Sequence, residues 1–203
     1  MSAFWEDPIW ILLWPKHIKL SYLIEQCAKC YPRNLLRDRE KTRHQKAVDP
    51  VTGKVIGYAR WILPDELVKG KEGEICAEGV VEGVSEEKRK NFEELAASAW
   101  WDRGAHNLKI GDIDDVNIAV RNRIVAEKPY IRIGTALVES RIEKAEELGV
   151  PLFAMPYKAG LEIYTRLGFK EVDRVIQDDS QYGGKEEYGA YFMIYDAPKG
   201  TES

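Results

Sequence analysis

Cysteine, methionine and histidine are scarce in this 203-residue sequence, which contains three of each. An odd number of thiols without a second C-x-x-C pair gives no disulfide framework, so we expect a reduced, cytoplasmic compartment. A zinc site from Cys27, Cys30, His17 and His44 is the alternative. The histidines lack ligand-like spacing, and the helical periodicity around both thiols favours plain helix residues. We therefore expect no metal.

Long apolar runs and an excess of positive charge are also missing. The most apolar N-terminal stretch, residues 9–13, follows Glu6, Asp7 and Pro8 and ends before Lys16. It is too short to span a bilayer and lacks the basic start of a signal peptide. With 30 Lys and Arg against 34 Asp and Glu, the net charge is −4, which is not the footprint of a phosphate-backbone binder. Neither membrane nor nucleic acid is an expected partner.

The composition is that of a globular protein. Hydrophobic residues make up 44% and aromatic residues 10%, enough for a sizeable core, which excludes intrinsic disorder. The length predicts a single domain over residues 1–203, with an N-terminal helical part at 1–42 and a core at 43–196. We expect a monomer or a homodimer.

Local patterns predict the first elements. Residues 3–30 repeat apolar side chains at helical spacing and predict two helices broken around Pro15. The basic run from Arg33 to Lys46 favours a solvated surface over an anion or partner site. Residues 44–48 and 54–63 flank the turn sequence Asp49 to Gly53, which predicts a β-hairpin. Ser85, followed by two glutamates, predicts a helix start.

The second half predicts a β-α-β unit. Residues 113–120 read as a strand, 135–148 as a helix stopped by Gly149, and 151–155 as a short buried strand. Such a unit forces a parallel strand pair. A helix over 159–167 and strands over 169–172 and 188–195 follow, so the predicted class is α+β with a mixed sheet. Gly134, at the start of the first helix, would let free N–H groups hold a pyrophosphate.

Three motifs carry a resemblance to a known family. The sequences Ile133 to Leu137, Glu147 to Gly149 and Ile163 to Phe169 resemble, in order and spacing, the two central motifs of the GNAT family of acyl-CoA-dependent N-acetyltransferases. The resemblance covers about residues 43–196. It implies a mixed, mostly antiparallel sheet with a central splayed parallel pair and flanking helices, in which the strand ending at Val120 is the first partner of that pair.

The resemblance also implies a function. Acetyl-CoA would be the co-substrate, and its acetyl group would pass to a primary amine, most simply that of a small molecule, by direct attack. Tyr164 would protonate the leaving thiolate and Asp114 would be the base, with Asp115 and Glu78 as competitors. The expected acceptor contacts are Trp61, Glu78 and Tyr182. The expected cofactor contacts are the backbones of Ile118, Val120, Ile131, Arg132, Ile133, Gly134, Thr135 and Ala136.

Two other functions stay open at this point. The family's phosphate fingerprint has a glycine where Arg132 stands, so a catalytically silent acyl-CoA-binding or regulatory protein that contacts partners is the main alternative. An acetyltransferase that modifies proteins is the third hypothesis, and it would need an open acidic groove for a basic peptide.

Overall fold

The computed structural model describes residues 5, 7, 10–70, 74–100, 111–134, 138–184 and 187–197. The chain forms two compact units. One is helical and comprises Met1–Arg37, Glu82–Asn117 and Ile176–Tyr188, and the other carries most of the sheet and comprises Asp38–Val81, Ile118–Val175 and Gly189–Ser203. Each unit is described by itself.

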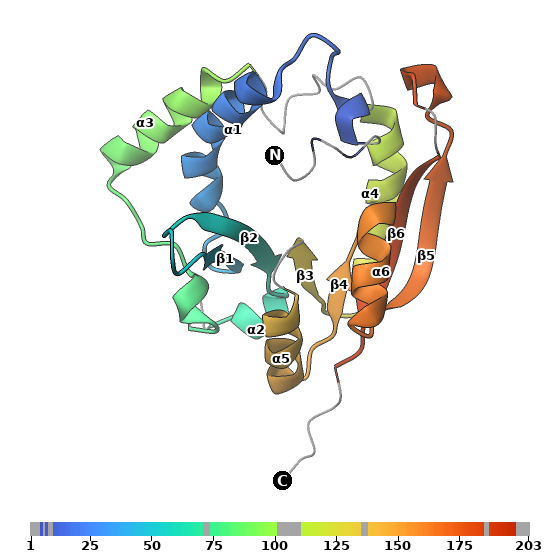
Figure 1. Cartoon of the computed structure of the whole chain (residues 1–203). Helices are drawn as coiled ribbons and strands as arrows, with labels where there is room; N and C mark the ends of the chain where they lie inside the picture. The colour runs from blue at the N-terminus through green and yellow to red at the C-terminus, as the bar shows by residue number, and fades with distance from the viewer. Residues whose placement is uncertain are drawn as a thin grey trace. The chain divides into compact units, whose positions relative to one another are not determined.

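The helical unit is built on a pair of amphipathic helices. A 3₁₀ helix, η2 (Trp10–Leu13), precedes α1 (Leu20–Leu35), which lies beside α3 (Glu86–Ala97) (Figure 1). The side chain of Ser85 caps α3, because its Oγ accepts a hydrogen bond of 3.3 Å from the Lys88 N–H. Cys27 and Cys30 lie on the buried face of α1, which confirms their expected place on a helix. The short helix η4 (Ser180–Tyr182) belongs to the same unit.

The sheet starts with the predicted hairpin. β1 (Thr42–Val48) pairs antiparallel with β2 (Val55–Ile62). At the turn, the Asp49 carboxylate accepts hydrogen bonds from the Val51 N–H at 2.9 Å and the Thr52 hydroxyl at 2.6 Å, and Gly53 has a positive φ. Two short helices, α2 (Asp65–Val68) and η3 (Ala77–Gly79), follow the hairpin.

A parallel strand pair lies at the centre of the sheet. β3 (Ile131–Gly134), α5 (Glu139–Leu148) and β4 (Leu152–Ala154) form the β-α-β unit, with Ile131 opposite Leu152 and Ile133 opposite Ala154. After α6 (Lys158–Arg166), β5 (Lys170–Gln177) and β6 (Tyr188–Tyr195) complete a six-stranded sheet in the order β1-β2-β3-β4-β6-β5. The predicted α+β class with a mixed sheet is therefore confirmed. The central pair is parallel and is paired at three positions, from Ile131 opposite Leu152 to Ile133 opposite Ala154.

The expected strand over residues 113–120 is wrong, because these residues belong to the helix α4 (Gly111–Glu127). Val116, Val120 and Ile124 recur at helical spacing, acidic residues fall in the first turns, and Pro129 follows the last turn. These signals are stronger than the alternation of β-branched residues that suggested a strand. The partner of β4 is consequently β3, which lies further along the chain.

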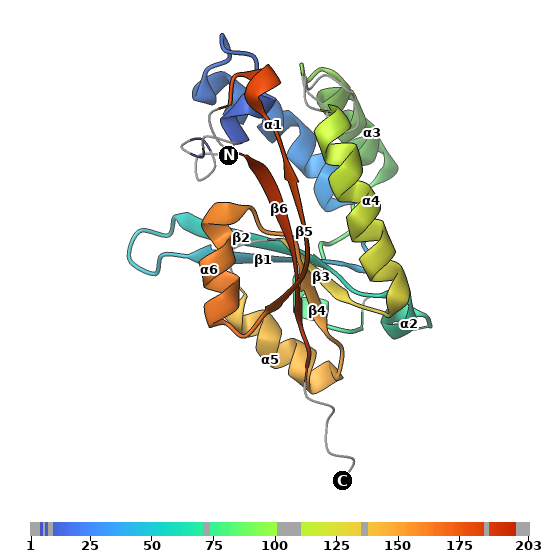
Figure 2. The same ribbon diagram turned by 90° about the vertical axis from the view of Figure 1, so that its right-hand side faces the viewer.

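Helices cover both faces of the sheet. On one face, the core brings together residues of α5 and α6 with the sheet, including Val138, Ala145, Tyr164 and Leu152. On the other face, Ile124 of α4 packs in a second cluster with Tyr130, Phe153, Ala190, Phe192 and Ile194. Figure 2 shows α5 and α6 on one side of the strands and the C-terminal part of α4 on the other.

Gly149 and Gly168, which end α5 and α6, provide a matched test of local packing. Both have positive φ, but a Cβ at Gly149 would meet nothing within 4 Å, whereas one at Gly168 would lie 3.3 Å from the Tyr195 ring. We expect Gly149→Ala to lower the free energy of unfolding by about 1 kcal/mol, and Gly168→Ala by about 2 kcal/mol, because a steric contact adds to the backbone strain. Urea titration measures both, and equal losses would contradict the Tyr195 contact.

Candidate functional site

The candidate proton donor, Tyr164, lies in the core of the sheet unit. Tyr164 is 2% exposed, and its ring meets the Phe169 ring edge-on, with the two ring centroids 5.2 Å apart. Gly160, one turn earlier in α6, packs closely against Pro156, because a Cβ there would lie 3.1 Å from the Pro156 Cβ, whereas its distance of 3.7 Å to a Tyr164 ring carbon would be an ordinary contact. The helix α6, which follows β4 directly, therefore holds the phenol in one position.

Burial also sets the protonation state of Tyr164. Desolvation raises the pKa of this phenol from 10.0 to about 12. The group is therefore neutral across the physiological range and keeps its proton for donation. Its acidity is lower than that of an exposed tyrosine.

The residues expected to hold the pyrophosphate are instead largely a strand. Ile131, Arg132, Ile133 and Gly134 form β3, which pairs with β2 on one side and β4 on the other. Backbone groups that bond to neighbouring strands are not available to cradle a phosphate. These four residues therefore form a strand instead of the expected loop, and their contact with a cofactor stays a prediction. Thr135 and Ala136 lie outside the described residues.

Three further predicted residues lie on α4 rather than on a strand. Ile118 is 40% exposed and Val120 is half-buried against the second core cluster. In the middle of a helix, their backbone groups bond within the helix, so they cannot contact pantetheine as a strand edge would. Asp114 falls within the first turn of the same helix, and its role as a base stays a prediction.

Trp61, expected at the acceptor, is buried in the core. The residue is 1% exposed, and the guanidinium of Arg141 on α5 lies 4.1 Å from its ring centroid. This stacking is a cation–π contact, which a buried arginine can make without a carboxylate. An acceptor could touch Trp61 only if Arg141 moved.

A second arginine, Arg43 of β1, is fully buried beside Cys76. Its Nε donates to the Ile75 carbonyl at 2.7 Å, and its Nη1 reaches the carbonyls of Arg39, Glu40 and Thr42. Burial lowers the pKa of Arg43, and nearby negative groups including Glu78 oppose that shift. The expected solvated surface is thus wrong at this position.

Cys76 and Glu78 lie on the short segment that covers Arg43. Cys76 has a positive φ of 52° and is buried, whereas Glu78 is exposed. Desolvation raises the pKa of the Cys76 thiol, although Lys144, Arg141 and Arg43 act in the opposite direction. The thiol is therefore protonated at neutral pH and is a poor nucleophile. One region of the sheet unit therefore contains Trp61, Arg141 and Glu78.

Tyr182, also expected at the acceptor, lines a pocket in the helical unit. The pocket has a volume of about 260 Å³, and its other lining residues are Trp5, Ile11, Trp14, Pro15, Lys16 and Ile18. Two indole rings and a phenol offer flat apolar surface, and Lys16 adds a positive charge. Such a pocket suits a planar apolar group.

Sequence reasoning missed the two buried arginines, although one signal was present. Val138, Arg141, Ala145 and Leu148 recur at spacings of three and four residues, which places Arg141 on the apolar stripe of its helix. A charged residue at such a position is buried with a partner. No similar signal marks Arg43, because its neighbours in the basic run are charged as well.

No protein-family model matches the sequence, and no curated protein matches it significantly. Among the described residues, no three His, Cys, Asp or Glu side chains are grouped so that they could hold a metal ion. No helix in the described ranges is both long and apolar enough to cross a membrane.

The raised pKa of Tyr164 predicts a loss of stability at high pH. The unfolded phenol ionises near pH 10 and the folded one near pH 12, so the native state binds the extra proton between these values and the free energy of unfolding falls. The fall attributable to Tyr164 is about 3 kcal/mol. Urea titrations from pH 8 to 12 should show a shallower decline in Tyr164→Phe. Parallel curves would contradict the burial of the phenol.

Proposed function

We propose that this protein is an N-acetyltransferase of the GNAT type, which transfers the acetyl group of acetyl-CoA to the primary amine of a small molecule. One observation carries the proposal. The β3-α5-β4 unit forms a parallel pair at the centre of an otherwise antiparallel order of strands, and the helix that follows β4 carries Tyr164. A parallel pair followed by a helix that carries the tyrosine agrees with the resemblance, although β3 replaces the strand ending at Val120 as the first partner of the pair.

The corrected strand moves the proposed cofactor site along the chain. In sheets of this kind, ligands bind beyond the carboxyl ends of parallel strands, where the following helix begins. The pyrophosphate would therefore lie beyond Gly134 and Ala154, near the start of α5.

The reaction needs no covalent enzyme intermediate. The amine nitrogen attacks the carbonyl carbon of the thioester, the N–C bond forms, and the C–S bond then breaks with its electron pair going to sulfur. A base accepts the proton that leaves the nitrogen, and Tyr164 donates its phenolic proton toward the sulfur. Solvent then restores the proton of the phenol. The protonated Cys76 thiol has no part in these steps.

Calorimetry of acetyl-CoA binding tests the proposal directly. We expect the purified chain to bind acetyl-CoA and free CoA with micromolar affinity but not NAD. Gly134→Glu, which adds bulk and negative charge at the end of β3, should abolish binding, whereas Gly149→Ala at the other end of α5 should not change it. Circular dichroism checks that both variants fold. Absence of binding to the folded wild-type chain would overturn the proposal.

Removal of the Tyr164 hydroxyl tests the chemical role. Once an acceptor amine has been found by screening, Tyr164→Phe should lower kcat by about 100-fold while the affinity for acetyl-CoA changes by less than about threefold, because only the leaving-group proton is lost. Rate measurements with thioesters of more acidic thiols should restore much of the loss. An unchanged kcat in the variant would remove Tyr164 from the role.

One observation favours a second function, that of a catalytically silent protein which contacts acyl-CoA or a partner. The strand β3 contains residues that the family resemblance assigned to the phosphate loop. Residues 135–138 then remain between β3 and α5. Partner binding without acetyl-CoA binding would support this second function.

A further inference from the structure

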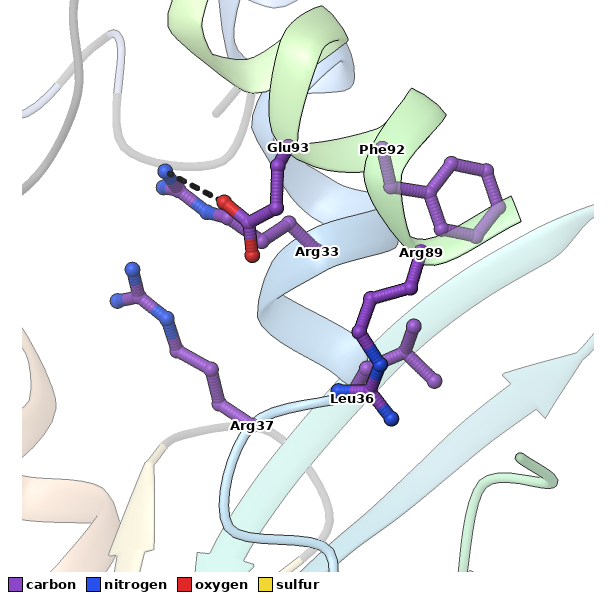
Figure 3. A pocket seen from close by; sticks show the side chains of 6 residues that line it. All are labelled: Arg33, Leu36, Arg37, Arg89, Phe92 and Glu93. Atoms are coloured by element: carbon purple, nitrogen blue, oxygen red, sulfur yellow. Dashed lines mark ion pairs between the residues drawn. The ribbon is translucent and has the colours of Figure 1, made fainter. Parts of the chain in front are cut away.

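A pocket in the helical unit gathers positive charge that the proposed acetyltransferase does not use. It lies between α1 and α3 and has a volume of about 40 Å³. Three arginines, one glutamate and two apolar residues line it (Figure 3): Arg33, Arg37, Arg89, Glu93, Leu36 and Phe92. Two of these arginines begin the basic run of the sequence.

Two of the three arginines of this pocket pair with an acidic side chain. Arg33 is 7% exposed and pairs with Glu93 at 3.9 Å, and Arg89 pairs with Glu86 at 3.6 Å. Arg37 is exposed, and its side chain makes no ion pair or hydrogen bond within the described part of the chain. In Figure 3, the guanidinium groups of Arg33 and Arg37 extend to the same side, with the Glu93 carboxylate beside Arg33. The lining residues thus carry three positive charges against one negative charge.

We propose that this pocket binds a phosphate group, either inorganic phosphate or the terminal phosphate of a phosphomonoester. The positive charge that remains on the pocket lining attracts a phosphate anion, and the forked donors of arginine match its oxygens. A site for one water needs roughly 10–15 Å³, so a pocket of about 40 Å³ has room for a small tetrahedral anion and not for a larger head group. Leu36 and Phe92 form apolar walls, which strengthen the attraction between the charges.

The geometry gives each charged residue a different role. Arg37 is the free donor at the exposed side of the pocket, and Arg33 is the buried one. Glu93 competes with the anion for Arg33, since it is the acidic residue in the lining. Loss of Arg37 should therefore weaken binding, and loss of the Glu93 charge should strengthen it. A purely structural role of the cluster would not produce these opposite effects.

The experiment is a titration of the full-length chain with inorganic phosphate at constant ionic strength, followed by NMR or calorimetry. We expect saturable binding with a dissociation constant of about 1 mM or below, as a few charge-assisted hydrogen bonds would give. Arg37→Gln should weaken this binding at least fivefold, and Glu93→Gln should tighten it. Arg166→Gln, an exposed arginine on α6 outside the pocket, is the matched control and should leave the affinity unchanged.

A second ligand, a phosphoserine peptide, identifies the source of the phosphate. A phosphoserine peptide that binds tenfold more tightly than inorganic phosphate would assign the site to a phosphomonoester, and equal affinities would assign it to the free anion. The proposal is overturned if phosphate does not bind saturably, or if Arg37→Gln and Arg166→Gln have the same effect. Failure of acetyl-CoA binding would not affect this site, because it does not depend on the proposed acetyltransferase activity.

Discussion

Parallel pairing between β3 and β4 is the constraint on which the rest of the sheet unit depends. Two parallel neighbours cannot be joined by a tight turn, so the chain must cross the sheet between them, and α5 makes this crossing. The crossing helix must bury one face, which places Val138 and Ala145 in the core. The same pairing fixes where β4 ends, and therefore where α6 begins and where Tyr164 lies.

The fold was predictable where the local signals agreed with each other. Asp49 and Gly53 identified the hairpin because turn chemistry and flanking β-rich runs pointed to the same structure, and Ser85 identified the start of α3 for a similar reason. The strand prediction for residues 113–120 was wrong. β-branched residues alternate there, but over the longer segment the apolar residues recur at helical spacing. The error placed the first parallel strand more than ten residues too early, and it assigned residues of β3 to the expected phosphate loop.

The candidate site was predictable only in part, because burial of charge is a tertiary property. Arg43 lies in a run of basic residues that reads as surface, yet backbone carbonyls from two segments surround its guanidinium group. Leaving such a group without acceptors would be costly, so the segment that carries Ile75 and Cys76 must close over β1. Trp61 is also buried, and the guanidinium of Arg141 lies against its ring.

The high pKa of the buried Tyr164 phenol affects the proposed proton transfer to the leaving thiolate, and so does the burial of the surrounding core. A phenol with a pKa of about 12 is a weaker acid than a thiol in water, whose pKa is about 8.5, so proton transfer to a solvated thiolate would be uphill. Cys76 belongs to the same core cluster, and burial raises the pKa of its thiol too. A thiolate that leaves into this environment would be more basic than in water, because desolvation disfavours every anion there. In the proposed reaction, burial of both groups would narrow the difference between their pKa values and would favour transfer of the proton as the C–S bond breaks rather than afterwards.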